Sequence, residues 1–429
     1  MAGIEGAARL FSIGIPIFAV LALTEKLYGY FKGNDTVPWM DALSSSYSGI
    51  TFVARTLLGY SIAIIPYAYM VQHIALIHIE NTLLLYAVSF IVIDFNSYWG
   101  HRLVHEINFL WNRHLIHHSS EEFNLACALR QSIGDVVNFL FFLSIPSALL
   151  GISPAVIAVV IPLHKLAQYW YHTRQIGKLG FLEHVLVTPS HHRVHHALNP
   201  LYLDKNYSAV FIVWDKLFGT FQAELDDVPP VYGITRPVRS FNPITINFDH
   251  LFLMFKDAWR AEKWMDKLTI WVRPTGWRPE GFEEKYPVVK ITDPYHFEKF
   301  HPQHSKGLVA WSSIQFFILL FTVIYIMRNM AAIGPGGLFS MAILVFVQVY
   351  SATELMNHNK WAPVFAVLST LVCTGLFMAN QSWFGMAAVS IWLPLMYLAY
   401  FVLQSVLALW FTYRIHSRNI LQLIPIPNN

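Results

Sequence analysis

Long apolar segments alternate with polar stretches along most of the 429 residues. A helix needs about 20 mostly apolar residues to cross the hydrocarbon core of a bilayer. The pattern therefore predicts membrane-spanning helices over residues 8–24, 57–79, 82–98, 133–150, 154–172, 308–327, 337–353, 362–380 and 384–412.

Two pairs of these segments are predicted to form tight helical hairpins. The first covers residues 57–98 and turns at Glu80-Asn81, and the second covers 133–172 and turns at 151–154. The second turn is well marked, because glycine closes helices and the residue before a proline resists helical backbone angles. Both hairpins return to the side from which they start, so the polar stretches outside them share one side. They carry most of the lysines and arginines, which predicts that they face the cytoplasm.

The composition agrees with a membrane protein. The chain is 55% hydrophobic and only 13% charged, whereas a soluble chain carries about a quarter charged residues. Its net charge of +3 offers no basic surface of the kind that binds nucleic acid. Cys127 and Cys373 lie far apart in apolar surroundings and are expected to be reduced core residues.

Histidine is the unusual residue, because 12 of the 20 histidines fall between His101 and His196. Eight of them form three clusters with spacings of three and four residues, which place side chains on one face of a helix. Neutral imidazole is a ligand suited to Fe, Cu, Zn and Ni. The candidate metal ligands in the clusters are His101 and His105, then His114, His117 and His118, then His192, His195 and His196. Spacing favours His192 over its neighbour His191 as a ligand but does not decide between them.

A fourth segment adds Gln168 and His172, which share a helix face at the end of an apolar segment. Polar groups at such a depth are costly and usually functional. With His172 there are nine candidate imidazoles, too many for one catalytic zinc with three protein ligands, so two metal ions are expected. Carboxylate-bridged di-iron bundles use a Glu-x-x-His pair on each of two helices. Only Glu298 and His301 have that spacing here, so a histidine-rich site is expected instead.

The histidine clusters and the strings around them resemble the fatty acid hydroxylase / sterol desaturase superfamily of non-haem di-iron membrane enzymes. The clusters alone are typical of the superfamily, and the flanking strings are most similar to its alkylglycerol monooxygenase branch. The resemblance is strong over residues 85–235 and elsewhere rests mainly on hydropathy. The strings that carry it are residues 99–108, 111–118, 128–132, 188–196, 204–207 and 218–221.

This resemblance implies two iron ions, O₂ as co-substrate and tetrahydrobiopterin as reductant. It implies hydroxylation of the ether-linked carbon of a membrane alkylglycerol, which then collapses to a fatty aldehyde and a glycerol. An electron donor or a pterin-recycling system is the implied partner. In related enzymes an acidic residue at the position of Glu106 is implicated in pterin recognition; alternatively, Glu106 orients a ligating histidine. Glu106 and Gln168 are the candidate catalytic residues beside the metal ligands.

The expected fold is all-α, a multi-pass membrane helical bundle with a cytoplasmic histidine-rich di-metal cap. N-terminal membrane helices are expected over residues 1–81, a fatty acid hydroxylase-type catalytic domain over 82–235, a polar cytoplasmic segment over 236–307 and C-terminal membrane helices over 308–429. Such a protein would reside in a bacterial inner membrane or the endoplasmic reticulum.

Three alternatives stay open on the sequence. The first is another reaction on the same scaffold, namely sterol desaturation or hydroxylation of a fatty acyl chain or carotenoid. The second is a metal transporter, although a transport site usually lies near the bilayer midplane and these clusters lie at the ends of the predicted helices. The third is an inactive relative, against which the presence of every histidine cluster argues.

Overall fold

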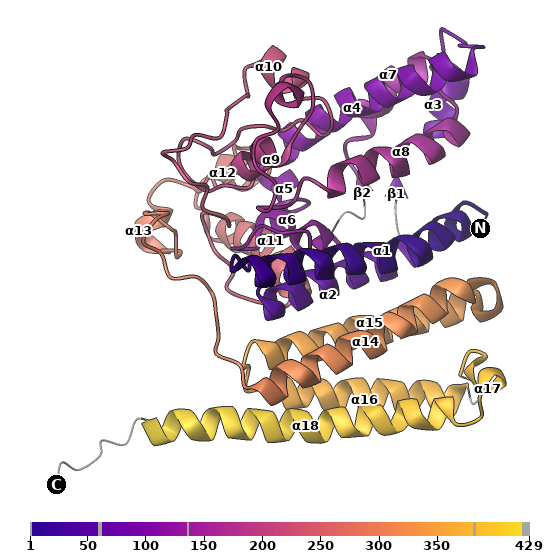
Figure 1. The fold of residues 1–429 in the computed structure, drawn as a ribbon, viewed down its shortest axis with the longest axis vertical. Helices are drawn as coiled ribbons and strands as arrows, with labels where there is room; N and C mark the ends of the chain where they lie inside the picture. The colour runs from indigo at the N-terminus through magenta and orange to yellow at the C-terminus, as the bar shows by residue number, and fades with distance from the viewer. Residues whose placement is uncertain (1, 59–61, 135–136, 381–382, 423–429) are drawn as a thin grey trace.

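The computed structural model describes residues 2–58, 62–134, 137–380 and 383–422, and these are mostly helical (Figure 1). Long helices run side by side, and short helices and loops gather at one end of them. The all-α membrane fold expected from the sequence is confirmed. The long helices are α1 (Ala2–Lys32), α2 (Trp39–Leu57), α4 (Thr82–Glu106), α8 (Pro154–Tyr169), α14 (Lys306–Arg328), α15 (Met330–Met356), α16 (Ala362–Ala379) and α18 (Leu393–Gln422).

Within the described residues, five helices are long and apolar enough to cross a membrane: α4, α14, α15, α16 and residues Leu393–Ser417 of α18. A sixth crossing is possible where Phe141–Leu149 meets Pro154–Tyr169 at a bend of 117°. The expected spans over 82–98, 308–327, 337–353 and 362–380 therefore correspond to continuous helices. The segment 384–412 instead begins with the short α17 (Met386–Val389), and its long helix starts at Leu393.

The expected span over residues 57–79 is wrong. This part of the chain forms the two-residue strand β1 (Ile62–Ala63) and the eight-residue α3 (Tyr67–Ile74), and the backbone at Ala75 is extended. Proline is tolerated at the start of a helix but breaks a helix when it lies in the interior. Pro66 precedes the first residue of α3, so a helix that began earlier in the chain does not run through it. The first hairpin is therefore absent, although α4 does begin at the predicted turn, where the Asn81 side chain accepts a hydrogen bond from the backbone N–H of Leu84.

The helix that packs beside α14 and α15 in this part of the chain is α2, which the hydropathy pattern did not single out. One face of α2 is buried but consists of small polar residues, Ser44, Ser45, Ser48 and Thr51. Three of them donate to backbone carbonyls, as the Ser44 hydroxyl does to that of Phe241 at 2.8 Å, and the Ser45 hydroxyl accepts from the guanidinium of Arg130 at 3.0 Å. A buried face made of hydroxyls lowers mean hydropathy, and hydropathy alone does not recognise it.

The second predicted hairpin is also modified. Residues 133–150 do not form one span but β2 (Val137–Asn138), the 3₁₀ turn Phe141–Ser144 and α7 (Ile145–Leu149). The turn itself is where the sequence placed it. Gly151 has a φ of +64°, and Ser153 caps α8 at its proline start. β1 and β2 pair in parallel, and this two-residue ladder is the only sheet among the described residues.

The polar end of the bundle is a cap that covers the histidine-bearing segments (Figure 1). Extensive loops connect its helices, and several of those loops carry backbone carbonyls toward the histidines. The cap helices are α5 (Asn108–Trp111), α6 (Leu115–His118), α9 (Pro189–His195), α10 (Val213–Phe218), α11 (Pro243–Arg260), α12 (Trp264–Thr269) and α13 (Phe282–Lys285), with 3₁₀ turns at Cys127–Leu129 and Gly180–His184.

Candidate metal centre

The structure gathers all nine candidate histidines at the cap end of α4 and α8. They fall into two groups, and within each group one ring nitrogen per residue lies within 4.8 Å of the others. The first group is His101, His105, His114, His118 and His195, and the second is His117, His172, His192 and His196.

The two groups do not follow the clusters in the sequence. His117 belongs to the second group while its neighbour His118 belongs to the first, and His195 is separated in the same way from His196. The groups adjoin each other, since the rings of His118 and His196 stack with centroids 4.2 Å apart. The short helices α6 and α9 therefore contribute donors to both groups, and each group could hold a metal ion.

Backbone carbonyls fix the ring orientation of several histidines. Nδ1 of His101 lies 2.7 Å from the carbonyl oxygen of Tyr207, and Nδ1 of His195 lies 2.9 Å from that of Lys205. Nδ1 of His172 lies 3.1 Å from the carbonyl oxygen of Gln168. A carbonyl can only accept, so each Nδ1 carries the proton and each Nε2 presents a lone pair. Ligating histidines in metal sites are generally held in this way.

Some of these nitrogen lone pairs point toward one another. Nε2 of His172 lies 3.3 Å from Nε2 of His117, whose Nδ1 lies 3.3 Å from the carbonyl of Arg130. Two acceptors at this separation repel, and a bound cation removes the repulsion. Within the described residues, Nε2 of His105, His118 and His195 is buried without a hydrogen-bond partner. Buried polar atoms without partners are rare, and a metal ion would satisfy these three.

Burial also keeps the imidazoles in the form that binds metal. It lowers the pKa of His172 to about 3 and that of His195 to about 4, and it lowers the pKa of His114, His117, His118, His192 and His196 as well. Neutral imidazoles at pH 7 offer a lone pair without a competing proton. The donor set, which is all imidazole, is suited to Fe, Cu, Zn and Ni.

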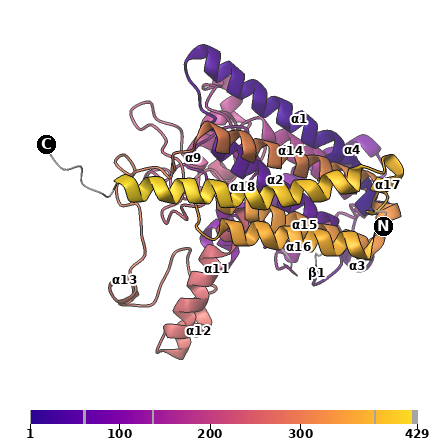
Figure 2. The same ribbon diagram turned by 90° about the horizontal axis from the view of Figure 1, so that it is seen from below.

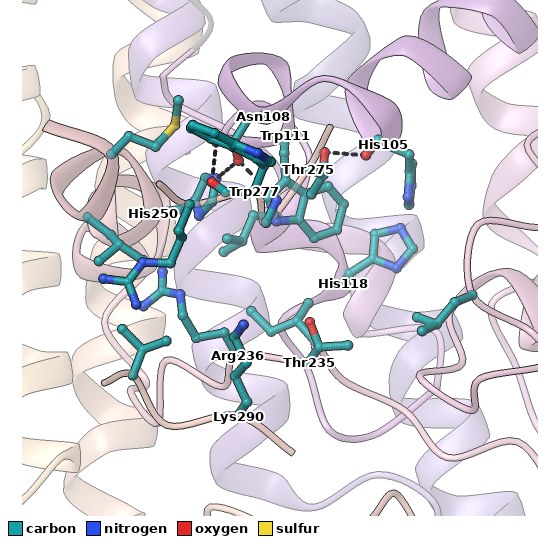
Figure 3. Close-up of a pocket in the computed structure, with 18 of the residues that line it drawn as sticks. His105, Asn108, Trp111, His118, Thr235, Arg236, His250, Thr275, Trp277 and Lys290 are labelled. Atoms are coloured by element: carbon teal, nitrogen blue, oxygen red, sulfur yellow. Dashed lines mark hydrogen bonds between the residues drawn. The ribbon is translucent and has the colours of Figure 1, made fainter. Parts of the chain in front are cut away.

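A cavity of about 420 Å³ opens onto the first group only. Figure 3 shows His105 and His118 on one side of it, with Arg236 and Lys290 on another. His195 lines it as well, so the three members of the first group that reach the cavity are those whose Nε2 is buried without a partner. The cavity therefore leads to the unpartnered ring nitrogens of the first group.

The walls of this cavity come from distant parts of the chain. Trp111 and Leu115 are near the second histidine cluster, but most of the lining belongs to α11 and to loops between residues 233 and 290. Asn108 links α11 to the loop after α12. Its side-chain oxygen accepts a hydrogen bond from Nε2 of His250 at 2.9 Å and another from the backbone N–H of Gly276 at 3.1 Å. Sequence motifs did not point to these residues, because long-range packing alone brings them to the metal.

Glu106 and Gln168 lie at the edge of the centre. The Glu106 carboxylate accepts from the guanidinium of Arg102 at 2.8 Å, and its side chain is 43% exposed. The Gln168 side chain donates to Nδ1 of His164 at 2.8 Å, and Nε2 of His164 in turn lies 2.7 Å from Asp94. His191 lies outside both groups of histidines, where its Nδ1 is 3.4 Å from the Thr188 hydroxyl.

Asp94 and Asn206 hold the loop that supplies the carbonyls. The Asp94 carboxylate accepts from the backbone N–H groups of Val210 and Phe211 and from the indole N–H of Trp214. Asn206, with a φ of +57°, donates to the carbonyl oxygen of His191 at 3.1 Å. The loop thereby presents its carbonyls to His101 and His195. The structure thus gives each of these two residues a defined set of contacts in support of the ligands.

A membrane protein with two adjoining groups of buried histidines that open onto a cavity has the construction of a metal-dependent membrane oxygenase. The fatty acid hydroxylase family model matches residues 86–220, which include every one of the nine histidines. The chain is thus a lipid-hydroxylating membrane monooxygenase with a multi-pass helical anchor.

Relatives extend the match beyond this domain. The alkylglycerol monooxygenase of Homo sapiens is 34% identical over 369 residues, which cover 85% of this chain and 80% of the relative. The alkylglycerol monooxygenase of Danio rerio is 35% identical over 383 residues, with coverages of 89% and 84%. The ornithine lipid hydroxylase OlsE of Rhizobium tropici is 28% identical over 134 residues, with coverages of 31% and 40%. No solved structure matches significantly.

The chain belongs to the alkylglycerol monooxygenase family. The resemblance inferred from the histidine clusters and their flanking strings is confirmed, and the match extends well beyond residues 86–220.

Proposed function

We propose that this protein is a di-iron monooxygenase that cleaves the ether bond of alkylglycerol lipids. The observation that carries the proposal is the pair of adjoining histidine groups, one of which opens onto a cavity. We assign one iron to His101, His105, His114, His118 and His195, and the second iron to His117, His172, His192 and His196. The names of the relatives support the substrate.

The proposed reaction inserts one oxygen atom of O₂ into the C–H bond of the ether-linked carbon. The other oxygen atom leaves as water, with two electrons from a tetrahydropterin and two protons. The product is a hemiacetal, which collapses to a fatty aldehyde and a glycerol. Bound iron would supply the activation of O₂ for this step.

The residues of the chain orient the lipid and exclude water. We propose that the ether carbon lies beside His105, His118 and His195, where the cavity reaches the first group. The indole of Trp111, whose ring centroid is 5.0 Å from that of His105, forms an apolar wall there. The polar end of the cavity, near Asn108, suits the glycerol hydroxyls. A dry, shaped pocket limits side reactions of a strong oxidant.

Two further residues receive roles as proposals. The half-exposed carboxylate of Glu106 is suited to accept hydrogen bonds from the amino-pyrimidine edge of a pterin, at the end of α4. Gln168 is assigned a positioning role, because its carbonyl accepts from Nδ1 of His172 and its side chain bonds to His164. We further propose that the cap faces the cytoplasm, where a pterin-recycling system can reach it, and that the hydroxylase domain spans residues 82–235.

The experiment measures aldehyde release by the full chain in lipid nanodiscs with iron, O₂ and a tetrahydropterin. We expect a fatty aldehyde from a 1-O-alkylglycerol and none from the monoacylglycerol of the same length. His118→Ala should abolish release, whereas His184→Ala, which changes an exposed histidine outside both groups, should leave it intact. Absence of aldehyde, together with sterol or acyl-chain oxidation supported by an electron-transfer protein, would contradict the proposal.

A further inference from the structure

Helices α11 and α12 and the turn after them expose an unusual number of large apolar side chains. Each of these side chains is between 54% and 85% exposed. Exposed apolar surface of this extent marks an interaction site in a folded protein. We call this surface the apolar ridge, and its residues are Phe252, Phe255, Trp259, Trp264, Met265, Leu268 and Val272.

The ridge is a regular face of α11. Phe252, Phe255 and Trp259 are spaced by three and four residues and therefore share one side of the helix. The opposite side is buried: Met254 and Asp257 face the cavity beside the metal centre, and the carboxylate of Asp257 pairs with Arg278. α11 thus has two apolar sides, and the core accounts for only one of them.

Positive charge surrounds the ridge. The same stretch carries five basic residues, which are Lys256, Arg260, Lys263, Lys267 and Arg273. Its acidic residues are only Glu262, Asp266 and the buried Asp257. Lys267 lies over the ring of Trp264 at 5.4 Å. Aromatic residues interleaved with lysine and arginine are typical of helices that lie in the interface of a bilayer.

The ends of this helix pair lie at the ends of membrane-crossing helices. Asn242, which caps α11, donates to the carboxylate of Glu354, two residues before the end of α15. After α12, the backbone N–H of Asn108 donates to the carbonyl of Arg273 at 2.9 Å, and that of Thr275 donates to the carbonyl of Glu106 at 3.1 Å. Glu106 is the last residue of α4. Both attachments therefore lie where spans leave the hydrocarbon.

The direction of helices α11 and α12 also agrees with a position at the membrane surface. Figure 2 shows α11 and α12 extending sideways from the bundle, across the direction of the long helices. A helix that runs across the spans at the level of their ends lies along the membrane surface.

We propose that α11 and α12 form a peripheral membrane-binding element, with the apolar ridge in the headgroup layer of the bilayer that the chain spans and the basic residues on anionic lipid headgroups. The chain's own spans hold the element at the surface, so a few apolar side chains suffice to seat it. Because the other side of α11 lines the cavity, the element lies between the lipid layer and the metal centre.

The test uses the full chain in nanodiscs and two labelling positions with the same residue and the same exposure. Val272, on the ridge, and Val289, in the loop after α13, are each 70% exposed. Val272→Cys and Val289→Cys are labelled with an environment-sensitive fluorophore, and the native Cys127 and Cys373 are buried. Lipids with a nitroxide quencher at the headgroup boundary then report contact.

We expect about half of the emission to be quenched at position 272 and almost none at position 289, since interfacial helices insert about 5–10 Å. The pair Lys256→Gln and Lys263→Gln should reduce quenching at 272 in discs that contain phosphatidylserine but not in discs of phosphatidylcholine alone. Equal quenching at the two positions, or quenching at neither, would overturn membrane binding and leave the ridge to a protein partner. Equal effects of the lysine changes in both lipids would overturn the role of anionic headgroups. The readout needs no turnover, so it is independent of the proposed reaction.

Discussion

The carboxylate of Asp94 accepts four hydrogen bonds, and its replacement by asparagine tests how the ligand loop is held. Oδ1 accepts from His164 and from the backbone N–H of Val210 at 2.7 and 2.9 Å. Oδ2 accepts from the backbone N–H of Phe211 and the indole N–H of Trp214 at 3.1 and 2.8 Å. All four partners are donors, since Gln168 donates to Nδ1 of His164 and leaves the proton on Nε2.

Asp94→Asn keeps the shape of the side chain but retains only one oxygen. Two of the four donors then face an NH₂ group that cannot accept. Each such loss costs about 1.5–3 kcal/mol when the bond is to a charged group, so the two together cost about 3–6 kcal/mol. Since folded proteins are stable by about 5–15 kcal/mol, we expect a lower thermal midpoint and a mobile loop around Tyr207, whose carbonyl holds His101.

The assay compares thermal midpoint, iron content and protease cleavage within residues 205–215 in the same detergent. We expect the midpoint to fall by roughly 5 °C and iron content to fall with it. Asp226→Asn is the control, because Asp226 is 93% exposed and only its contact with Lys178 is lost. If the two variants have the same thermal midpoint, iron content and protease cleavage, the Asp94 carboxylate does not hold the loop and the reasoning is refuted.

Three more outcomes follow from the geometry. His105→Ala and His196→Ala, one from each group, should each remove about one of two iron ions per chain by elemental analysis; loss of both ions or of neither would contradict independent ligand sets. Gly151→Ala should destabilise the fold by about 2 kcal/mol or more in thermal unfolding, because φ is +64° and a Cβ would lie 2.2 Å from the carbonyl oxygen of Ile77. Gly336→Ala, where a Cβ meets no atom within 4 Å, is its control and should be neutral. Removal of iron by a chelator should lower the thermal midpoint, and added Fe(II) should restore it, because metal binding relieves the opposed lone pairs of His117 and His172; an unchanged midpoint would mean that iron does not hold the cap.

The sequence predicted which histidines come together better than it predicted the membrane topology. Apolar segments such as 308–327 became single helices because nothing interrupts them. The segment 57–79 failed because Pro66 divides it, and α2 was missed because Ser44 and its neighbours bury hydroxyls rather than alkyl groups. Hydropathy measures transfer to lipid, whereas α2 is buried against protein and satisfies its polar groups there.

The cavity was beyond sequence reasoning for a different reason. His250, Thr275 and Trp277 have no motif in common with the histidine clusters, and they reach the metal centre only because α11 and the loop after α12 fold over it. Asn108 makes this contact specific, since it bonds at once to His250 and to the backbone at Gly276. The role of Asn108 is therefore recognised from its hydrogen-bond partners in the structure and not from the residues next to it in the sequence.

The division of the clusters between two groups has a consequence for how the centre assembles. Helix spacing places His192, His195 and His196 together, but α9 gives His195 to the first group and the other two to the second. The segment that ends in His117 and His118 is divided in the same way. The short helix α9 therefore positions donors for both groups, and neither group can form its geometry while α9 is displaced. A loss of iron after a change in α9 or its supporting loop should hence affect both positions, whereas the loss of one imidazole affects one.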